Sequence, residues 1–269
     1  MECGCCPFLA SDDPKDLSHS IWVRKQHIYK NLDLHILTPS RWLGECVRKS
    51  SLLGRFQVSV IPNCIDTSVF RPLEEGELSP RWQYLQDIKA SKPILLYGAM
   101  NATTDNRKGF SFLLSAMQIM ERLGKNDSFE LIVFGADRPL EGMPMAGPVH
   151  YVGYISDSRE LASLYNLASA MIVPSLTENL SCTIMESLSC GTPVVAFNIG
   201  GNSDLIDHKQ NGYLANEKDS EDLAEGILWC LDNNRDNKLS QNARKKVLEN
   251  YTPEVVGKQY TEFFLSVIK

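Results

Sequence analysis

The sequence of 269 residues has no apolar run that approaches the roughly 18 residues a membrane-spanning helix needs. Its first residues, Met1–Cys6, have neither the basic nor the apolar region of a signal peptide. Positive charge is also in short supply, because the net charge is −6 and leaves no electrostatic footprint for a nucleic-acid backbone. These absences predict a cytoplasmic protein that binds no nucleic acid.

Several common functional motifs are missing as well. There is no internal repeat, no phosphate-binding P-loop and no G-x-G-x-x-G sequence. The thiols of Cys3, Cys5 and Cys6 cluster, but no second pair or histidine at a suitable spacing completes a zinc site. We therefore expect no metal centre. Cys182 has no histidine near it in the sequence and is expected to be a small packing residue rather than a nucleophile.

The chemistry is instead concentrated in residues 174–194, which lie between two short apolar runs, 168–173 and 193–197. Such runs are typical of buried parallel strands. Between them, Ser181 is a suitable helix N-cap, and Gly191 stands where a helix ends. The pattern predicts a strand, a loop, a helix and a second strand. In an open parallel sheet, ligands bind at the loop that follows a strand.

This loop combines a helix N-terminus with two carboxylates. Unpaired N–H groups and the positive end of the helix dipole suit a diphosphate, which we expect on the amides of Asn179, Leu180 and Ser181. Glu178 lies just before the helix, and Glu186 lies about 7.5 Å along it at roughly 1.5 Å per residue. Carboxylates accept paired hydrogen bonds from vicinal hydroxyls. Glu178 is therefore expected to contact the hexose of a nucleotide diphosphate sugar, and Glu186 its ribose.

A second loop brings positive charge to the same place. Residues 92–98 form a predicted buried strand that ends in glycine, and Arg107, Lys108 and Gly109 precede the next predicted helix. This cationic pair would lie at the carboxyl end of its strand, beside the crevice that Glu178 faces. A cation there can neutralise the charge of a bound diphosphate.

The segment that runs from Glu178-Asn-Leu through Glu186-Ser-Leu to Gly191-Thr-Pro-Val-Val resembles the donor-site signature of retaining glycosyltransferases of the GT-B fold, the group 1 or family 4 glycosyltransferases. The resemblance covers residues 20–265. It implies an α/β fold with a Rossmann-like parallel sheet flanked by helices, and Lys108 stands at the family's phosphate-lysine position. The catalytic residues by resemblance are Lys108 and Glu178, and the donor-binding residues are Arg107, Lys108, Gly109, Glu178, Asn179, Leu180, Ser181 and Glu186.

The resemblance also implies a reaction. A hexose would pass from a nucleotide-sugar donor to a hydroxyl of a sugar or lipid-linked acceptor, with retention at the anomeric carbon and with no metal or other cofactor. The setting would be polysaccharide or glycoconjugate biosynthesis, and a peripheral position at the inner membrane face stays open. The family's usual arginine after the first glycine is replaced by Ala99 and Met100, and whether Arg107 substitutes for it stays open.

The domain organisation expected from the resemblance has three parts. Residues 1–69 form a remnant of the acceptor-side domain, residues 70–252 the donor-binding domain, and residues 253–269 a C-terminal crossover helix. So short an N-terminal part cannot build the whole acceptor domain, and none of the five histidines matches the catalytic one of the family. Two alternatives therefore remain: a noncatalytic or split-subunit nucleotide-sugar-binding module with a separate acceptor-domain chain, and a sugar-nucleotide epimerase.

Overall fold

The computed structural model describes residues 3–125, 127–136 and 147–268. The chain divides into two compact units, Met1–Pro62 and Asn63–Lys269. The expected boundary followed residue 69, whereas the division falls between Pro62 and Asn63. The reason is that the segment after Pro62 joins the second unit: the Ile65 N–H donates to the carbonyl of Tyr251 at 2.9 Å.

The first unit holds a two-stranded parallel sheet and two helices. The strands β1 (His35–Thr38) and β2 (Gln57–Val60) pair from His35↔Gln57 to Thr38↔Val60. The helix α2 (Arg41–Arg48) connects them and begins at Ser40, whose hydroxyl accepts a hydrogen bond from the Leu43 N–H at 3.1 Å. The helix α1 (Leu17–Tyr29) precedes β1 and buries only Trp22.

The second unit is built on a six-stranded sheet in the order β5-β4-β3-β6-β7-β8, and all of its paired strands are parallel. The central strands are buried because helices cover both faces. The strands are β3 (Ile94–Gly98), β4 (Glu130–Phe134), β5 (Val149–Gly153), β6 (Ala170–Val173), β7 (Val194–Phe197) and β8 (Gly212–Ala215).

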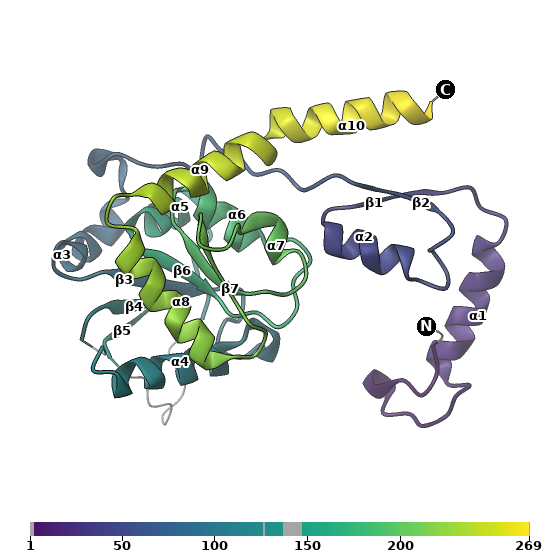
Figure 1. The fold of residues 1–269 in the computed structure, drawn as a ribbon, viewed down its shortest axis with the longest axis horizontal. Helices are drawn as coiled ribbons and strands as arrows, with labels where there is room; N and C mark the ends of the chain where they lie inside the picture. The colour runs from purple at the N-terminus through teal and green to yellow at the C-terminus, as the bar shows by residue number, and fades with distance from the viewer. Residues whose placement is uncertain (1–2, 126, 137–146, 269) are drawn as a thin grey trace. The chain divides into compact units, whose positions relative to one another are not determined.

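Alternation along β3 separates two hydrophobic cores. Ile94 and Leu96 face one core and Leu95 and Tyr97 face the other, since successive side chains of a strand point to opposite faces. Side chains of α3, α5, α6 and α9 fill the first core, and those of α4 and α8 fill the second. Figure 1 shows the ribbons of these helices around the sheet. The helices are α3 (Gln83–Ser91), α4 (Phe110–Arg122), α5 (Ser158–Leu167), α6 (Cys182–Ser189), α7 (Asn202–Leu205), α8 (Ser220–Asn233), α9 (Lys238–Asn250) and α10 (Pro253–Val267).

The strand order places a topological switch point between β3 and β6. The chain runs outward from β3 to β4 and β5, then returns to the other side of β3 and continues through β6, β7 and β8. The loops after β3 and β6 therefore leave the sheet in a crevice at its carboxyl edge, which is where ligands bind in open α/β sheets. None of the described helices is both long and apolar enough to cross a membrane.

Candidate functional site

Backbone contacts join the loops that follow β3 and β6. The 3-10 turn η4 (Asn106–Lys108) ends at Gly109, whose φ of +70° favours glycine. A Cβ at this position would lie 1.8 Å from the carbonyl oxygen of Pro174, so only glycine allows the loops to approach so closely. The Leu176 N–H donates to the carbonyl of Arg107 at 2.7 Å. These contacts hold the two loops, residues 99–109 and 174–181, together as the floor of the crevice.

Lys108 and Glu178 form an ion pair on this floor. The Nζ atom of Lys108 lies 2.8 Å from Oε1 of Glu178, and the side chains are 28% and 14% exposed. Both residues line a small cavity, together with Gly98, Ser181 and Thr183. The sequence predicted that Lys108 and Glu178 lie in one crevice, and the structure brings them into direct contact. The partial burial strengthens the attraction relative to a surface pair.

Arg107 is placed differently from its neighbour. Its guanidinium donates to both carboxylate oxygens of Asp105, at 3.0 Å from Nε and 2.7 Å from Nη2, and its side chain is 74% exposed. The Arg107 guanidinium holds the pKa of the Asp105 carboxyl below its usual range. Arg107 is thus committed to Asp105, while Lys108 is the cation that contacts Glu178.

Glu186 lies on α6, one turn into the helix. Its Oε2 accepts a hydrogen bond from the hydroxyl of Tyr165 at 2.8 Å. Burial raises the pKa of Glu186, and the Tyr165 hydroxyl works in the opposite direction because it stabilises the carboxylate. The sequence found Glu186 but gave no signal for Tyr165, whose hydroxyl meets α6 only through the packing of α5 against it.

The start of α6 supplies backbone donors. Asn179 and Leu180 precede the helix, and Ser181 is its N-cap residue, although its side chain makes no capping bond. The first helical residues are Cys182 and Thr183, whose N–H groups have no partner within a helix. Asn179, Leu180 and Ser181 therefore lie in the approach to the helix, and the first turn extends the donor set beyond the three amides that the sequence indicated.

Cys182 lies on the exposed side of this first turn, so the expectation that it is a packing residue is wrong. Cys182 is the first residue of α6, where the chain leaves the carboxyl edge of the sheet. Burial of part of the side chain raises the pKa of the thiol, and the charges of Glu186 and Glu178 raise it further. The thiol is thus neutral near pH 7, which is unsuitable for a nucleophile.

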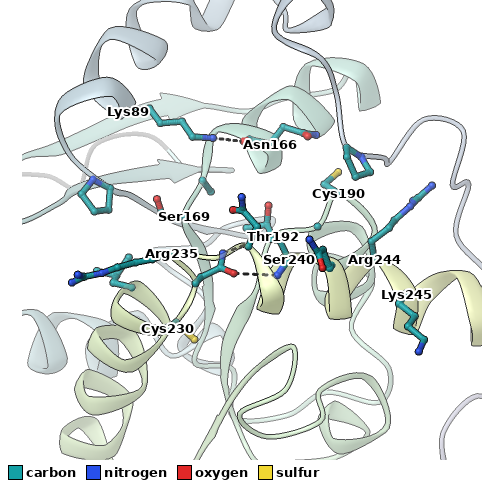
Figure 2. A pocket seen from close by; sticks show the side chains of 18 of the residues that line it. Lys89, Asn166, Ser169, Cys190, Thr192, Cys230, Arg235, Ser240, Arg244 and Lys245 are labelled. Atoms are coloured by element: carbon teal, nitrogen blue, oxygen red, sulfur yellow. Dashed lines mark hydrogen bonds between the residues drawn. The ribbon is translucent and has the colours of Figure 1, made fainter.

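Within residues 3–125, 127–136 and 147–268, no group of three or more His, Cys, Asp or Glu side chains is arranged to hold a metal ion. A cavity of about 890 Å³ lies elsewhere, and Figure 2 shows Ser169, Thr192 and Arg244 among the residues that line it. Ser169 and Thr192 precede β6 and β7, so this cavity lies at the amino edge of the sheet, opposite Lys108 and Glu178.

Comparison with known proteins agrees with this arrangement. The family profile described as "Glycosyl transferases group 1" matches residues 91–233, which is more than half of the chain. An uncharacterized glycosyltransferase of Methanocaldococcus jannaschii is 25% identical over 274 residues, covering 96% of this chain and 65% of the relative. A probable sucrose-phosphate synthase of Thermosipho melanesiensis is 27% identical over 226 residues, covering 76% of this chain and 46% of the relative.

Solved structures show the same fold. The sucrose-phosphate synthase of Thermosynechococcus elongatus superposes with a TM-score of 0.74 at 22% identity, over 97% of this chain and 65% of that one. The Anabaena protein HepE in complex with UDP and glucose superposes with a TM-score of 0.71 at 18% identity, over 91% of this chain and 66% of that one. At such identities the likeness shows the fold alone, and it confirms the predicted GT-B type of α/β architecture.

The chain spans only part of its relatives, with 36%, 65% and 46% of the length of three curated proteins covered. The family match nevertheless contains both loops at the switch point and the whole of α6. The chain therefore belongs to the group 1 glycosyltransferase family.

Proposed function

We propose that this chain is the donor-binding part of a retaining glycosyltransferase, which transfers a hexose from a nucleotide diphosphate sugar to a hydroxyl of a sugar or lipid-linked acceptor. The observation that carries the proposal is the Lys108–Glu178 pair at the switch point. It sets a cation and a carboxylate side by side, beside a helix N-terminus that favours anions. The HepE structures, which hold UDP and UDP-glucose on the same fold, support a nucleotide-sugar donor.

The residues have separate roles in the proposed reaction. The diphosphate lies against Lys108 and the first turn of α6, and the ammonium group neutralises the charge that develops as the glycosidic bond breaks. Glu178 accepts hydrogen bonds from hexose hydroxyls, and Glu186 accepts one from the ribose. Gly109 keeps the two loops close. No metal is required, because the ammonium group and the helix end supply the positive charge.

The donor replaces an existing interaction rather than adding a new one. Lys108 and Glu178 satisfy each other in the free protein. When the donor enters, the ammonium group turns to the diphosphate and the carboxylate turns to the sugar hydroxyls. Each charge keeps a partner throughout, so the site avoids the penalty of a partly buried, unpaired ion.

Calorimetric titration tests this proposal directly. The purified chain is titrated in EDTA with UDP, GDP, ADP and their common sugar conjugates. Binding of one nucleotide series is expected and would identify the base. A parent chain that binds none of them refutes the donor site, and binding that appears only after a divalent metal is added refutes the metal-free mechanism.

A second candidate is a nucleotide-sugar-binding module whose acceptor side comes from a separate chain. The observation in its favour is the first unit, where β1 and β2 are the two strands of its sheet in the described part of the chain. Parallel sheets ordinarily have more strands and are covered on both faces. Hydrolysis or transfer of the bound donor by this chain alone would refute this candidate, whereas tight donor binding without turnover would support it.

A further inference from the structure

The hydroxyl of Tyr165 engages one of the two carboxylate oxygens of Glu186. The bond from Tyr165 Oη to Oε2 is 2.8 Å long, and Tyr165 is fully buried. Among the bonds described for Glu186, no protein donor reaches the other oxygen, Oε1. The hydrogen bond to Oε2 restricts rotation of the carboxylate and leaves Oε1 available to a ligand.

Tyr165 is itself held from several directions. Its ring packs edge-on against Phe70 and Phe134, with centroids 6.3 and 6.2 Å away. Its main-chain carbonyl accepts a hydrogen bond of 2.6 Å from the hydroxyl of Thr192, which is labelled in Figure 2. These contacts restrict the movement of the phenol, whose hydroxyl points at Glu186.

The electrostatics around Glu186 give this bond a second effect. Burial raises the pKa of Glu186, and the Tyr165 hydroxyl is the interaction that lowers it. Burial also raises the pKa of Tyr165 well above its ordinary value, so the phenol remains a donor. The nearby thiols of Cys182 and Cys190 have raised pKa values and stay neutral, although the charge of Arg244 on α9 acts to lower the pKa of Cys190. The Tyr165 hydroxyl thus favours the ionised form of Glu186 against the effect of burial.

We propose that Tyr165 is a positioning residue for donor binding, which fixes the carboxylate of Glu186 so that Oε1 accepts a hydrogen bond from the ribose of the nucleotide. This role rests on the proposed function. It also accounts for a phenol at this buried position, because a phenylalanine would fill nearly the same volume but would leave the carboxylate without this bond.

The test compares Tyr165→Phe with Tyr213→Phe. Tyr213 is the matched control, because it is also buried and its hydroxyl also donates to a carboxylate, that of Asp222 at 2.7 Å, away from α6. Each variant is titrated with the nucleoside diphosphate that the parent binds and with the 2′,3′-dideoxy analogue of that nucleotide. The titrations are repeated from pH 5 to pH 9, and melting temperatures report folding.

Tyr165→Phe is expected to weaken binding of the ribonucleotide about tenfold at pH 7, as for loss of one bond to a charged group, and to leave the dideoxy analogue unaffected. The pH at which affinity halves should rise by about one unit, since a tenfold effect on ionisation equals one pKa unit. Tyr213→Phe should match the parent in both readouts. Glu186→Gln keeps an acceptor for Tyr165 and should leave only the pH dependence of the ligand's own phosphate, whose second pKa is about 6.

Two further measurements separate the possible failures. Carbon-13 NMR titration of the glutamate carboxyls, with Glu186 assigned through Glu186→Gln, needs no ligand and should show the Glu186 midpoint rise in Tyr165→Phe. Thr192→Val keeps the side-chain volume, removes the hydroxyl that holds Tyr165, and should shift the same midpoint in the same direction. Thr192→Val replaces Tyr165→Phe in this measurement if Tyr165→Phe unfolds at too low a temperature to be titrated.

Equal weakening of both nucleotides with an unshifted midpoint would show that Tyr165 is only structural, and would leave the proposed donor site intact. A parent chain that binds no nucleotide while the NMR midpoint still moves would instead refute the proposed function and the ribose contact together, and would retain only the control of Glu186 ionisation by Tyr165.

Discussion

Lys108→Ala is the sharpest test of the donor site, because it removes the proposed phosphate cation and leaves its carboxylate partner in place. Lys108 Nζ lies 2.8 Å from Glu178 Oε1, and the two side chains are only 28% and 14% exposed. At about 4 Å and an effective dielectric constant near 20, two unit charges interact by about 4 kcal/mol. A bound diphosphate replaces Glu178 as the partner of Lys108, so only part of this energy appears as affinity. We expect a loss of about 2 kcal/mol, which is about 30-fold in Kd.

The neighbouring arginine provides the matched control. Arg107→Ala removes a charge of the same sign from the adjacent position, but its guanidinium is bound to Asp105 and its side chain is 74% exposed. The expected loss of affinity is less than about threefold, since solvent screens such a charge. Both variants are titrated calorimetrically with the nucleoside diphosphate at two salt concentrations. The Lys108→Ala effect should shrink less with salt, because its site is partly buried.

A double variant tests whether Glu178 repels the diphosphate once Lys108 is removed. In Lys108→Ala, Glu178 becomes a carboxylate without its cation, close to an incoming dianion. The double variant Lys108→Ala with Glu178→Gln removes this repulsion and should regain part of the lost affinity for the free diphosphate. Equal losses in Lys108→Ala and Arg107→Ala would place the phosphate site elsewhere, as would binding by Lys108→Ala within threefold of the parent.

Three other predictions address the floor of the site, the burial of Glu186 and the exposed thiol. Gly109→Ala should lower the free energy of unfolding by about 3 kcal/mol or more in a denaturant titration, because its Cβ would lie 1.8 Å from the carbonyl oxygen of Pro174. The control Gly124→Ala, at a φ of +69° with no atom near its Cβ, should lower it by about 1 kcal/mol. Burial raises the pKa of Glu186, so the folded protein holds the proton of this carboxyl more tightly than the unfolded chain does. The free energy of unfolding therefore falls as the pH rises from the ordinary glutamate range through the folded-state pKa. Glu186→Gln should therefore melt above the parent at pH 7 and lose that advantage below the ordinary glutamate range; an equal or lower melting temperature at pH 7 would contradict the burial argument. Cys182 should react with iodoacetamide faster at pH 9 than at pH 7 and be protected by bound nucleoside diphosphate, as measured by peptide mass spectrometry; labelling that ignores the nucleotide would place the ligand away from the first turn of α6.

The elements with strong apolar periodicity could be predicted from the sequence. The strand pattern of residues 92–98 and the helix that follows it were confirmed because the alternating residues of β3 fill two separate cores. The helix α10 begins at Pro253, as the Thr252-Pro253 pair indicates, with the Thr252 hydroxyl accepting from the Val255 N–H at 3.3 Å. Strand alternation and helix capping depend on residues that are close together in the sequence, so they can be recognised without the structure.

The elements that were missed depend on contacts distant in sequence. The strand β8 has four residues and begins at Gly212, where a Cβ would lie 2.2 Å from the carbonyl oxygen of Val194. Its glycine is required by the neighbouring strand and makes the segment resemble a turn. The helix α3 buries Leu85 alone, so its periodicity is weak, and Trp82 just before it is anchored by a bond from Nε1 to the carbonyl of Glu160.

The site could be predicted in its residues but not in its pairings. Composition and spacing indicated Lys108, Glu178 and Glu186, because helix ends and strand ends fix where such side chains appear. Whether Arg107 joins Lys108 at the phosphate site was left open. The answer follows from Asp105, two residues before Arg107, which accepts from both the main-chain N–H and the side chain of that arginine and turns it outward. Lys108, next along the turn, then faces the crevice.

Three backbone contacts indicate that the loop carrying Glu178 is set before any ligand arrives. Gly109 approaches the carbonyl of Pro174, the Leu176 N–H binds the carbonyl of Arg107, and a Cβ on Gly200 would lie 1.8 Å from the carbonyl oxygen of Glu178 itself. Contacts at 174, 176 and 178 leave the segment little freedom. A loop ordered in advance avoids the entropy cost of ordering on binding, so more of the interaction energy appears as affinity. Gly200→Ala should therefore weaken donor binding through the position of Glu178. Unchanged calorimetric affinity in a folded Gly200→Ala variant would show that the loop adjusts freely and that its preorganisation contributes nothing.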